Sequence, residues 1–301
     1  MRVIIHDFDN LLIWLYLLID KMYKQTELQL YLFRFSNNNI PFFTDTELMT
    51  CAIFTELVGC KDKKHGYKYL RHHYTDWFPC LPSYEAYNHK LNKFKDALAY
   101  IFWILTKTYN ISKHPVAMID TAPIVVCQQQ HANNSKTAQP LASKGYCPAK
   151  KEFYIGVKLQ IIAQKITNSL PFPIDYHIET AATHDLDICK QTIPLVNLDN
   201  FDIYADKAYI DQSFQSELFE NSHIRLKTPI KKFKGKPPLT LFQKAENSIH
   251  SSTRQPIDTL FGWINKKTNI QNAANVRSIN GLVYHINVKM VAAVLLLIIN
   301  T

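Results

Sequence analysis

Hydrophobic positions follow two different spacings along the chain, and the change falls shortly after residue 112. Before it, apolar residues recur every three or four positions, the spacing of one helix face, most clearly over residues 84–107. Thr44 and Glu47 form a capping-box pattern, which predicts that a helix begins there. We therefore predict a helical domain over residues 1–112.

Residues 113–301 show the shorter periods of β-strands, separated by helical segments. Ile174, Tyr176 and Ile178 alternate with polar residues, so one face of this strand is predicted to be buried. Predicted strands cover residues 116–120, 153–163, 174–178, 201–206 and 224–228. Three helices are predicted between or after them: one capped by Thr183, one over residues 212–220 and one that bears Asp258. This order predicts a mixed α/β domain in the ribonuclease H-like arrangement.

The composition favours a globular protein with a polyanionic partner. The chain has 301 residues, 47% of them apolar and 20% charged, which is sufficient to bury a core. Its formal charge is +9 and its pI about 9.1, a balance that favours binding to nucleic acid. With only seven glycines, it contains neither a GxGxxG nor a P-loop pattern, which argues against a glycine-rich phosphate loop.

The chain carries no pattern that indicates export or a membrane. The apolar runs at residues 11–19 and 291–299 are too short to span a bilayer as helices, and we interpret both as core helices. The six cysteines lack Cys-x-x-Cys and zinc-finger spacings, which favours reduced thiols. We therefore expect a soluble, cytoplasmic protein without a membrane partner.

Two basic segments could contact a phosphate backbone. One covers residues 60–73 of the predicted helical domain, and the densest lies in the loop at 227–236, which contains Lys231, Lys232 and Lys234. In both cases the alternative is a solvated basic surface. The polar loop at residues 128–151 is long enough to be functional or disordered.

Three aspartates carry the predicted chemistry. Asp120 and Asp206 end apolar runs predicted to be buried strands, and Asp258 lies near the start of an amphipathic helix. A carboxylate at the end of a buried strand is costly unless a charge compensates it. Oxygen ligands without Cys or His suit a hard cation such as Mg²⁺. In a basic chain, this set predicts two-metal phosphoryl transfer on a phosphodiester.

Two cations accompany the third aspartate. Arg254 and Lys266 are predicted to lie near Asp258 on one helix face, where they would hold phosphate or orient the carboxylate. The alternative is a surface ion pair that contributes little. Glu246 is another candidate for the third carboxylate, but the residues around it lack the pattern found around Asp258.

Two other enzyme classes fit the sequence less well. Asp7 and Asp9 resemble the start of haloacid dehalogenase-like phosphatases, but Leu11 and the lack of a later Gly-Asp-x-x-x-Asp block argue against that class. A zinc enzyme would need spaced ligands, and the close pairs His72-His73 and His184-Asp185 do not supply them.

Several blocks together resemble the DDE-type transposases of bacterial insertion sequences, most of all insertion sequence family 982. The similar blocks are residues 5–9, 46–50, 78–84, 120–124, 156–159, 183–185, 206–209 and 254–261. They extend over nearly the whole chain in the family's order. Each block is weakly specific, and their order and spacing carry the resemblance.

The resemblance implies a ribonuclease H-like catalytic domain over residues 113–301, preceded by a DNA-binding region. It also implies two Mg²⁺ or Mn²⁺ ions, binding to terminal inverted repeats and target DNA, and a homodimer that holds two element ends. Asp120 and Asp206 fall on the first two acidic positions, while the third, usually Glu, is Asp258 here. Such an enzyme cuts a strand at the element end and joins the freed 3′-end to target DNA. Because Asp258 is one methylene shorter, a decayed DNA-binding remnant is the alternative.

Overall fold

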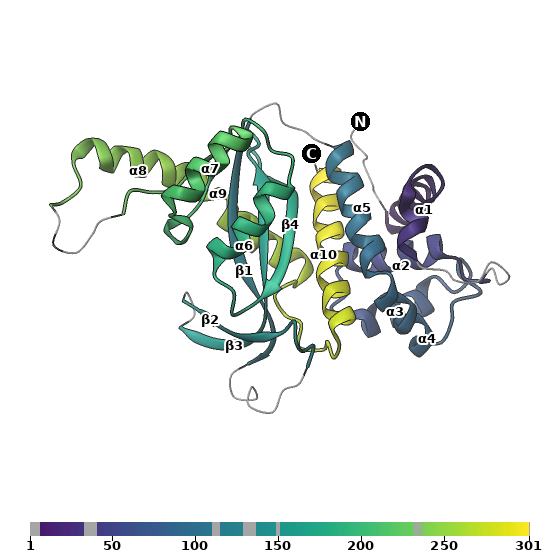
Figure 1. Ribbon diagram of the computed structural model, residues 1–301. Coiled ribbons are helices and arrows are strands. Elements are labelled where there is room, and N and C mark those ends of the chain that lie inside the picture. The colour runs from purple at the N-terminus through teal and green to yellow at the C-terminus, as the bar shows by residue number, and fades with distance from the viewer. Residues whose placement is uncertain are drawn as a thin grey trace. The chain divides into compact units, whose positions relative to one another are not determined.

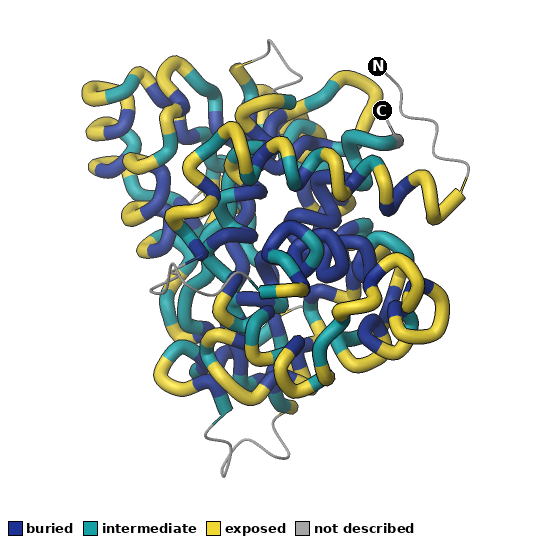
Figure 2. Tube along the Cα trace, turned by 90° about the vertical axis from the view of Figure 1, so that its right-hand side faces the viewer, coloured by how far each residue is buried: buried dark blue, intermediate teal, exposed yellow. Residues whose placement is uncertain are grey.

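The protein is described here by a computed structural model covering residues 7–32, 41–109, 115–128, 137–148, 151–231, 235 and 237–300. Its contacts divide the chain into two compact units. The helical unit comprises Met1–Tyr109, Ser135–Pro140 and Ile264–Thr301, and the α/β unit comprises Asn110–Asn134 and Leu141–Trp263. Many surface helices alternate between buried and exposed residues along their length (Figure 2).

The helical unit is assembled around its last helix. Its elements are α1 (Phe8–Gln25), η1 (Glu27–Leu32), α2 (Asp45–Leu57), α3 (Lys63–His73), α4 (Tyr84–Lys93), α5 (Lys95–Thr108) and α10 (Ile279–Asn300) (Figure 1). Nearly every side chain from Leu282 to Leu295 is buried, and α10 packs against α2, α4 and α5. The prediction from sequence grouped residues 264–301 with the second domain, whereas the contacts group them with the helical unit, whose core is formed largely by α10.

Among the described helices, only α10 is long and apolar enough to cross a membrane by length and composition. Of its most apolar stretch, 67% is buried inside the protein. It also carries the buried Lys289, whose ammonium pairs with Glu56. These features are those of a core helix, as the sequence predicts for residues 291–299, although the helix is longer than predicted.

Local sequence signals predicted the start of α2 correctly but did not predict the break between α4 and α5. The capping box is present, because Thr44 accepts from the backbone N–H of Glu47 and the Glu47 carboxylate accepts from the backbone N–H of Thr44. The helical spacing over residues 84–107 predicts one continuous helix, which is wrong, because the structure has two helices there. Phe94 ends α4 and begins α5, and its N–H donates to Leu91 in a tighter turn. The apolar stripe continues across this break, so its spacing does not reveal the break.

The α/β unit is built on a six-stranded sheet. Its strands are β1 (Val116–Gln128), β2 (Ser143–Cys147), β3 (Glu152–Gln164), β4 (Phe172–Thr180), β5 (Asp202–Tyr204) and β6 (Arg225–Lys227). The order is β2-β3-β1-β5-β6, and β4 pairs with β3. β3 is antiparallel to β1, β2 and β4, while β1, β5 and β6 are parallel. This confirms a mixed α/β domain.

The first strand differs from its prediction. The prediction ended it at Asp120, but β1 continues to Gln128, because its second half pairs with β3 as well. This close pairing requires Gly156, since a Cβ there would overlap the carbonyl oxygen of Ile124. The segment predicted to be one long loop contains β2.

Helices lie on both faces of this sheet. They are α6 (Asp185–Thr192), α7 (Gln212–Ser222) and α8 (Leu241–Arg254), with the short helices η3 (Ile193–Leu195) and η4 (Lys207–Tyr209). α9 (Pro256–Thr268) follows α8 and leads into the helical unit. Ile119 and Ile203 join Cys189 of α6 and Leu218 of α7 in one core cluster. The predicted Thr183 cap is wrong, because His184 accepts the N–H of Leu186 at the start of α6.

Candidate active site

Strand register brings two of the three predicted aspartates to the same level of the sheet. β1 and β5 pair in parallel, and Met118 lies beside Tyr204. Asp120 lies two residues after Met118 on β1, and Asp206 lies two residues after Tyr204, just past the end of β5. Because side chains alternate along a strand, Asp120 projects on the face opposite Ile119 and its core cluster. The chain at Asp206 is still extended, with φ −75° and ψ 176°, so the two aspartates share the Tyr204 face.

α8 is fixed on this same face by a histidine. His250 is its one buried residue, and the ring lies 5.4 Å from the ring of Tyr204. An imidazole nitrogen of His250 also lies 3.0 Å from the carbonyl oxygen of Lys227 in β6. Arg254 follows one turn later, so this anchor directs the last turn of α8 toward β1.

Arg254 joins two of the aspartates. Its Nη1 donates to Asp120 Oδ2 at 2.9 Å, and its Nη2 donates to Asp258 Oδ2 at 2.7 Å. Nη1 also lies 3.4 Å from Asp258 Oδ1, so one nitrogen contacts both carboxylates. The side chains of Arg254 and Asp120 are about one-fifth exposed, at 20% and 21%, and that of Asp258 is half exposed. The guanidinium therefore shows that one cation can contact both carboxylates.

The electrostatics of Asp120 favour a second positive charge. Burial is the main reason that the pKa of its carboxyl is raised to about 7; the Thr121 N–H and Arg254 act to lower this pKa, and the nearby Asp258 acts to raise it. The Thr121 N–H donates to Asp120 Oδ1 at 2.8 Å. One guanidinium and one amide thus compensate this largely buried carboxylate only in part. A further cation would lower the pKa of Asp120 and stabilise its ionised form.

The charge of Asp206 acts on the same arginine, but its side chain is exposed. Its side chain is exposed at the start of η4, and within the described chain it makes no hydrogen bond or ion pair. Its charge nevertheless contributes to the raised pKa of Arg254, together with Asp258 and Asp120. An exposed, unpaired carboxylate beside an arginine-bridged pair is available to an incoming cation.

The donor set suits a hard cation by its chemistry. All three side chains offer carboxylate oxygens, which are the preferred ligands of Mg²⁺ and Mn²⁺. In the arrangement observed, the described residues include no group of three or more His, Cys, Asp or Glu side chains close enough to hold a metal ion. Arg254 stands between Asp120 and Asp258, at the point where a cation would contact both.

The other predicted site residues are less closely associated with these carboxylates. Lys266 is exposed, eight residues and about 12 Å along α9 from Asp258, and it falls in the helical unit. Lys231 is exposed after β6, whereas Lys232 and Lys234 lie outside the described residues. Glu246 is exposed two turns before Arg254, and Arg254 pairs with Asp258 instead. His250 was not predicted, because a lone histidine in a polar helix carries no sequence signal.

Comparison with known proteins identifies one family. Its sequence profile, described as a transposase DDE domain, matches residues 111–278, more than half of the chain. The match includes Asp120, Asp206, Arg254 and Asp258. No curated protein and no solved structure matches the chain.

Proposed function

The chain belongs to the transposase DDE domain family, and from this membership we propose that it cuts the ends of an insertion sequence and joins them to target DNA. One observation carries the proposal beyond the family. Asp120 on β1 and Asp206 just after the neighbouring parallel strand β5 each lie two residues beyond the paired residues Met118 and Tyr204, and Arg254 connects Asp120 to Asp258. The proposed catalytic residues are therefore Asp120, Asp206 and Asp258.

The strand order supports a ribonuclease H-like domain. With β2 set aside, the order is β4-β3-β1-β5-β6, and β3 alone is antiparallel to the rest. In such a sheet, acidic residues lie at one level on the first strand and at the end of the parallel strand beside it, as Asp120 on β1 and Asp206 just after β5 do. The motif blocks favour insertion sequence family 982 within this fold.

We assign roles to the side chains as follows. Asp120 and Asp206 would hold Mg²⁺ or Mn²⁺, and Asp258 of α9 would supply a further carboxylate ligand. Two such ions, when bound, supply the positive charge that activates the attacking hydroxyl and stabilises the leaving oxygen. Arg254 pairs with Asp120 and Asp258 at the point where a cation would contact both, and its guanidinium would pair with a phosphate of the strand once a cation took that place.

Partners follow from charge and from the reaction. The net charge of +9 supports binding to double-stranded DNA, as terminal inverted repeats and as target. Lys231, Lys232, Lys234 and Lys266 are proposed to contact the phosphate backbone. Synapsis of two ends calls for a homodimer, and the exposed apolar side chains of Leu241, Phe242 and Ile249 on α8 support such a contact. The proposed location is the bacterial cytoplasm, on the nucleoid.

A decayed, DNA-binding remnant is the second candidate. It is favoured by the short side chain of Asp258 and by its pairing with Arg254. The two candidates predict different outcomes for Asp258→Glu, which adds one methylene toward Asp120. A remnant would gain metal-dependent cleavage through this longer carboxylate, whereas an active enzyme already cleaves with Asp258 and changes only in rate.

The proposal is tested with a DNA duplex carrying the ends of the encoding element, incubated with Mg²⁺, Mn²⁺ or EDTA. The wild type is expected to cut at the repeat end only with metal, and Asp120→Asn is expected to lose at least about 100-fold in rate, a lost stabilisation of about 3 kcal/mol. Asp187→Asn is the matched control, because Asp187 is exposed on α6, away from Arg254. Equal loss in both variants, or cutting in EDTA, would contradict the assignment.

A further inference from the structure

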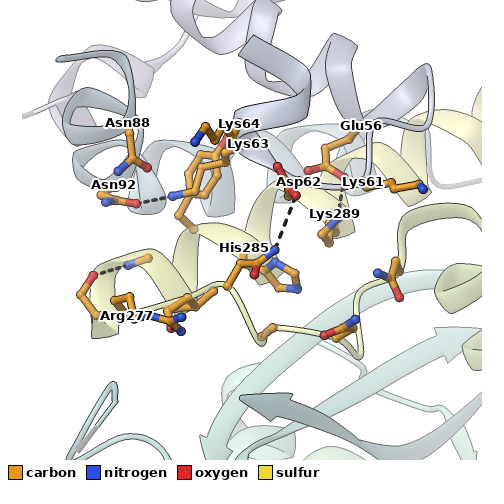
Figure 3. Close-up of a pocket in the computed structure, with 18 of the residues that line it drawn as sticks. Glu56, Lys61, Asp62, Lys63, Lys64, Asn88, Asn92, Arg277, His285 and Lys289 are labelled. Atoms are coloured by element: carbon orange, nitrogen blue, oxygen red, sulfur yellow. Dashed lines mark hydrogen bonds and ion pairs between the residues drawn. The ribbon is translucent and has the colours of Figure 1, made fainter. Parts of the chain in front are cut away.

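The helical unit contains a pocket that the proposed chemistry does not use (Figure 3). Its volume is about 420 Å³, within the range of about 300–1,000 Å³ typical of small-molecule sites. Its walls are the start of α3, one stripe of α4, the loop between α9 and α10, and one stripe of α10. On α4 the stripe is Tyr84, Asn88 and Asn92, spaced four residues apart so that all face the same side.

The charge of this pocket is positive. Five cationic side chains line it against two carboxylates, those of Glu56 and Asp62. Glu56 is already paired with Lys289 at 2.7 Å, so this pair contributes no net charge. Lys61 and Lys64 are exposed and have no ion-pair partner among the described residues. A ligand that fits this wall is therefore an anion.

Lys63 makes the strongest case for an anionic ligand. Its ammonium donates to Asn92 Oδ1 at 2.7 Å and lies 4.5 Å from the centre of the Tyr284 ring. None of the described carboxylates forms an ion pair with it. Burial lowers the pKa of Lys63 to about 8, which reports a charge that is poorly compensated. A bound phosphate would supply the missing counter-charge.

The rest of the lining suits a nucleobase. Five asparagines line the pocket, namely Asn88, Asn92, Asn269, Asn272 and Asn275. An amide carries both donors and an acceptor, as the edges of bases require, although Asn92, Asn272 and Asn275 already use one of these groups within the protein. The amide of Asn88 makes no hydrogen bond to any described residue, so it is available to a ligand. Tyr84 adds an aromatic ring on the same wall, against which a base can stack.

We propose that this pocket binds one deoxynucleoside 5′-monophosphate unit, its phosphate held by Lys63 and Lys64 and its base by Asn88. The inference rests on the proposed function in that DNA is the substrate. The same chemistry has two sources, an unpaired nucleotide within DNA or a free mononucleotide. The pocket shares no residue with the site of the three aspartates, because its lining residues belong to the helical unit and the aspartates to the α/β unit.

Calorimetric titration of the full chain tests this inference with three kinds of probe. These are the four deoxynucleoside 5′-monophosphates, the matching deoxynucleosides, and inorganic phosphate. We expect at least one monophosphate to bind more than tenfold tighter than its nucleoside and than phosphate. Lys64→Gln should weaken that binding about tenfold, one charge-assisted contact. Lys93→Gln is the matched control, since Lys93 is exposed on α4 and lies outside the pocket.

A second arm distinguishes the two sources. Fluorescence anisotropy compares a duplex with one unpaired nucleotide with a fully paired duplex of equal length. Preference for the unpaired nucleotide, lost in Lys64→Gln and in Asn88→Leu, assigns the pocket to DNA, whereas monophosphate binding without this preference assigns it to a free nucleotide. The inference is overturned if nucleosides bind as tightly as monophosphates. It is also overturned if Lys64→Gln changes neither the affinity for the monophosphate nor the preference for the unpaired nucleotide. Because Lys64 is exposed, that variant is expected to fold even if Asn88→Leu does not.

Failure of this inference can be separated from failure of the proposed function. Asp120→Asn should lose cleavage while its monophosphate affinity stays within twofold of wild type. Cleavage by a protein whose pocket binds no nucleotide would refute the inference alone. If the protein binds the nucleotide but never cleaves DNA, the inference about the pocket stands and the proposed transposase reaction is refuted.

Discussion

Lys289→Met should strongly destabilise the helical unit. The Lys289 ammonium lies 2.7 Å from Glu56 Oε2 and also donates to the Thr268 carbonyl oxygen. The two side chains are 2% and 8% exposed, so the ion pair connects α10 to α2 deep in the core. Methionine has a similar length but removes the charge, which leaves the Glu56 carboxylate buried without a partner. The expected loss is about 3–5 kcal/mol, a large share of the ~5–15 kcal/mol that stabilises a typical domain.

The stability of Lys289→Met should also depend on pH, in a direction that follows from the pKa of Glu56. Burial raises the pKa of Glu56 even with Lys289 in place, and removing Lys289 should raise it further. The native variant then binds more protons than the unfolded chain above the ordinary Glu pKa near 4.5. Its stability should therefore fall as pH rises above that value, and the deficit relative to wild type should be larger at pH 7 than at pH 4.5.

Urea unfolding followed by far-UV circular dichroism measures this loss. The control is Glu56→Gln combined with Lys289→Met, which leaves no buried charge and should recover at least half of the lost stability. The reasoning is refuted if Lys289→Met costs less than about 1 kcal/mol at pH 7, the scale of an exposed pair. It is also refuted if the double variant is no more stable than the single one.

Three further predictions concern local structure. Gly156→Ala should lower the free energy of unfolding in urea by at least about 3 kcal/mol, because the added Cβ would overlap the Ile124 carbonyl oxygen. Gly262→Ala is its control, because a Cβ there has open space around it, and it should be neutral or stabilising by up to about 1 kcal/mol. Thr44→Ala should cost about 1 kcal/mol, since it breaks the capping box of α2, and a loss below about 0.3 kcal/mol would show that the cap is dispensable. Burial lowers the pKa of His285 to about 3, so the unfolded chain binds the extra proton below pH 6.5. Lowering the pH from 7 to 5 should remove about 2 kcal/mol of stability in wild type and not in His285→Asn, and equal losses in both would contradict this.

The sequence predicted most strands of the α/β unit because their signals are local. Alternating positions such as Ile174, Tyr176 and Ile178 lie within β4, and the apolar run at 153–163 lies within β3. β2 was missed, since its five residues include Gly145 and pair only with β3 at one edge. α8 was missed because its buried face is reduced to His250, while its large apolar side chains are exposed.

The contacts of the candidate site also differ in how far local sequence predicts them. The Arg254–Asp258 pair follows from a spacing of four residues. Asp120 and Asp206 were selected because they end apolar runs, and the resemblance placed them on the family's first two acidic positions. The pairing of Arg254 with Asp120 spans 134 residues and depends on how α8 packs against Tyr204. No local pattern encodes that packing. For the same reason, the sequence could not show that α10 forms the core of the helical unit, with Glu56 as the partner of Lys289.

The account depends most on the claim that Asp120, Asp206 and Asp258 together bind a divalent cation. The most direct test is Mn²⁺ binding to the full chain, followed by the loss of the free-ion electron paramagnetic resonance signal. We predict that the wild type binds Mn²⁺, that each of Asp120→Asn, Asp206→Asn and Asp258→Asn weakens binding at least about tenfold, and that Asp187→Asn leaves it unchanged. Equal Mn²⁺ affinity in all five proteins would contradict the account.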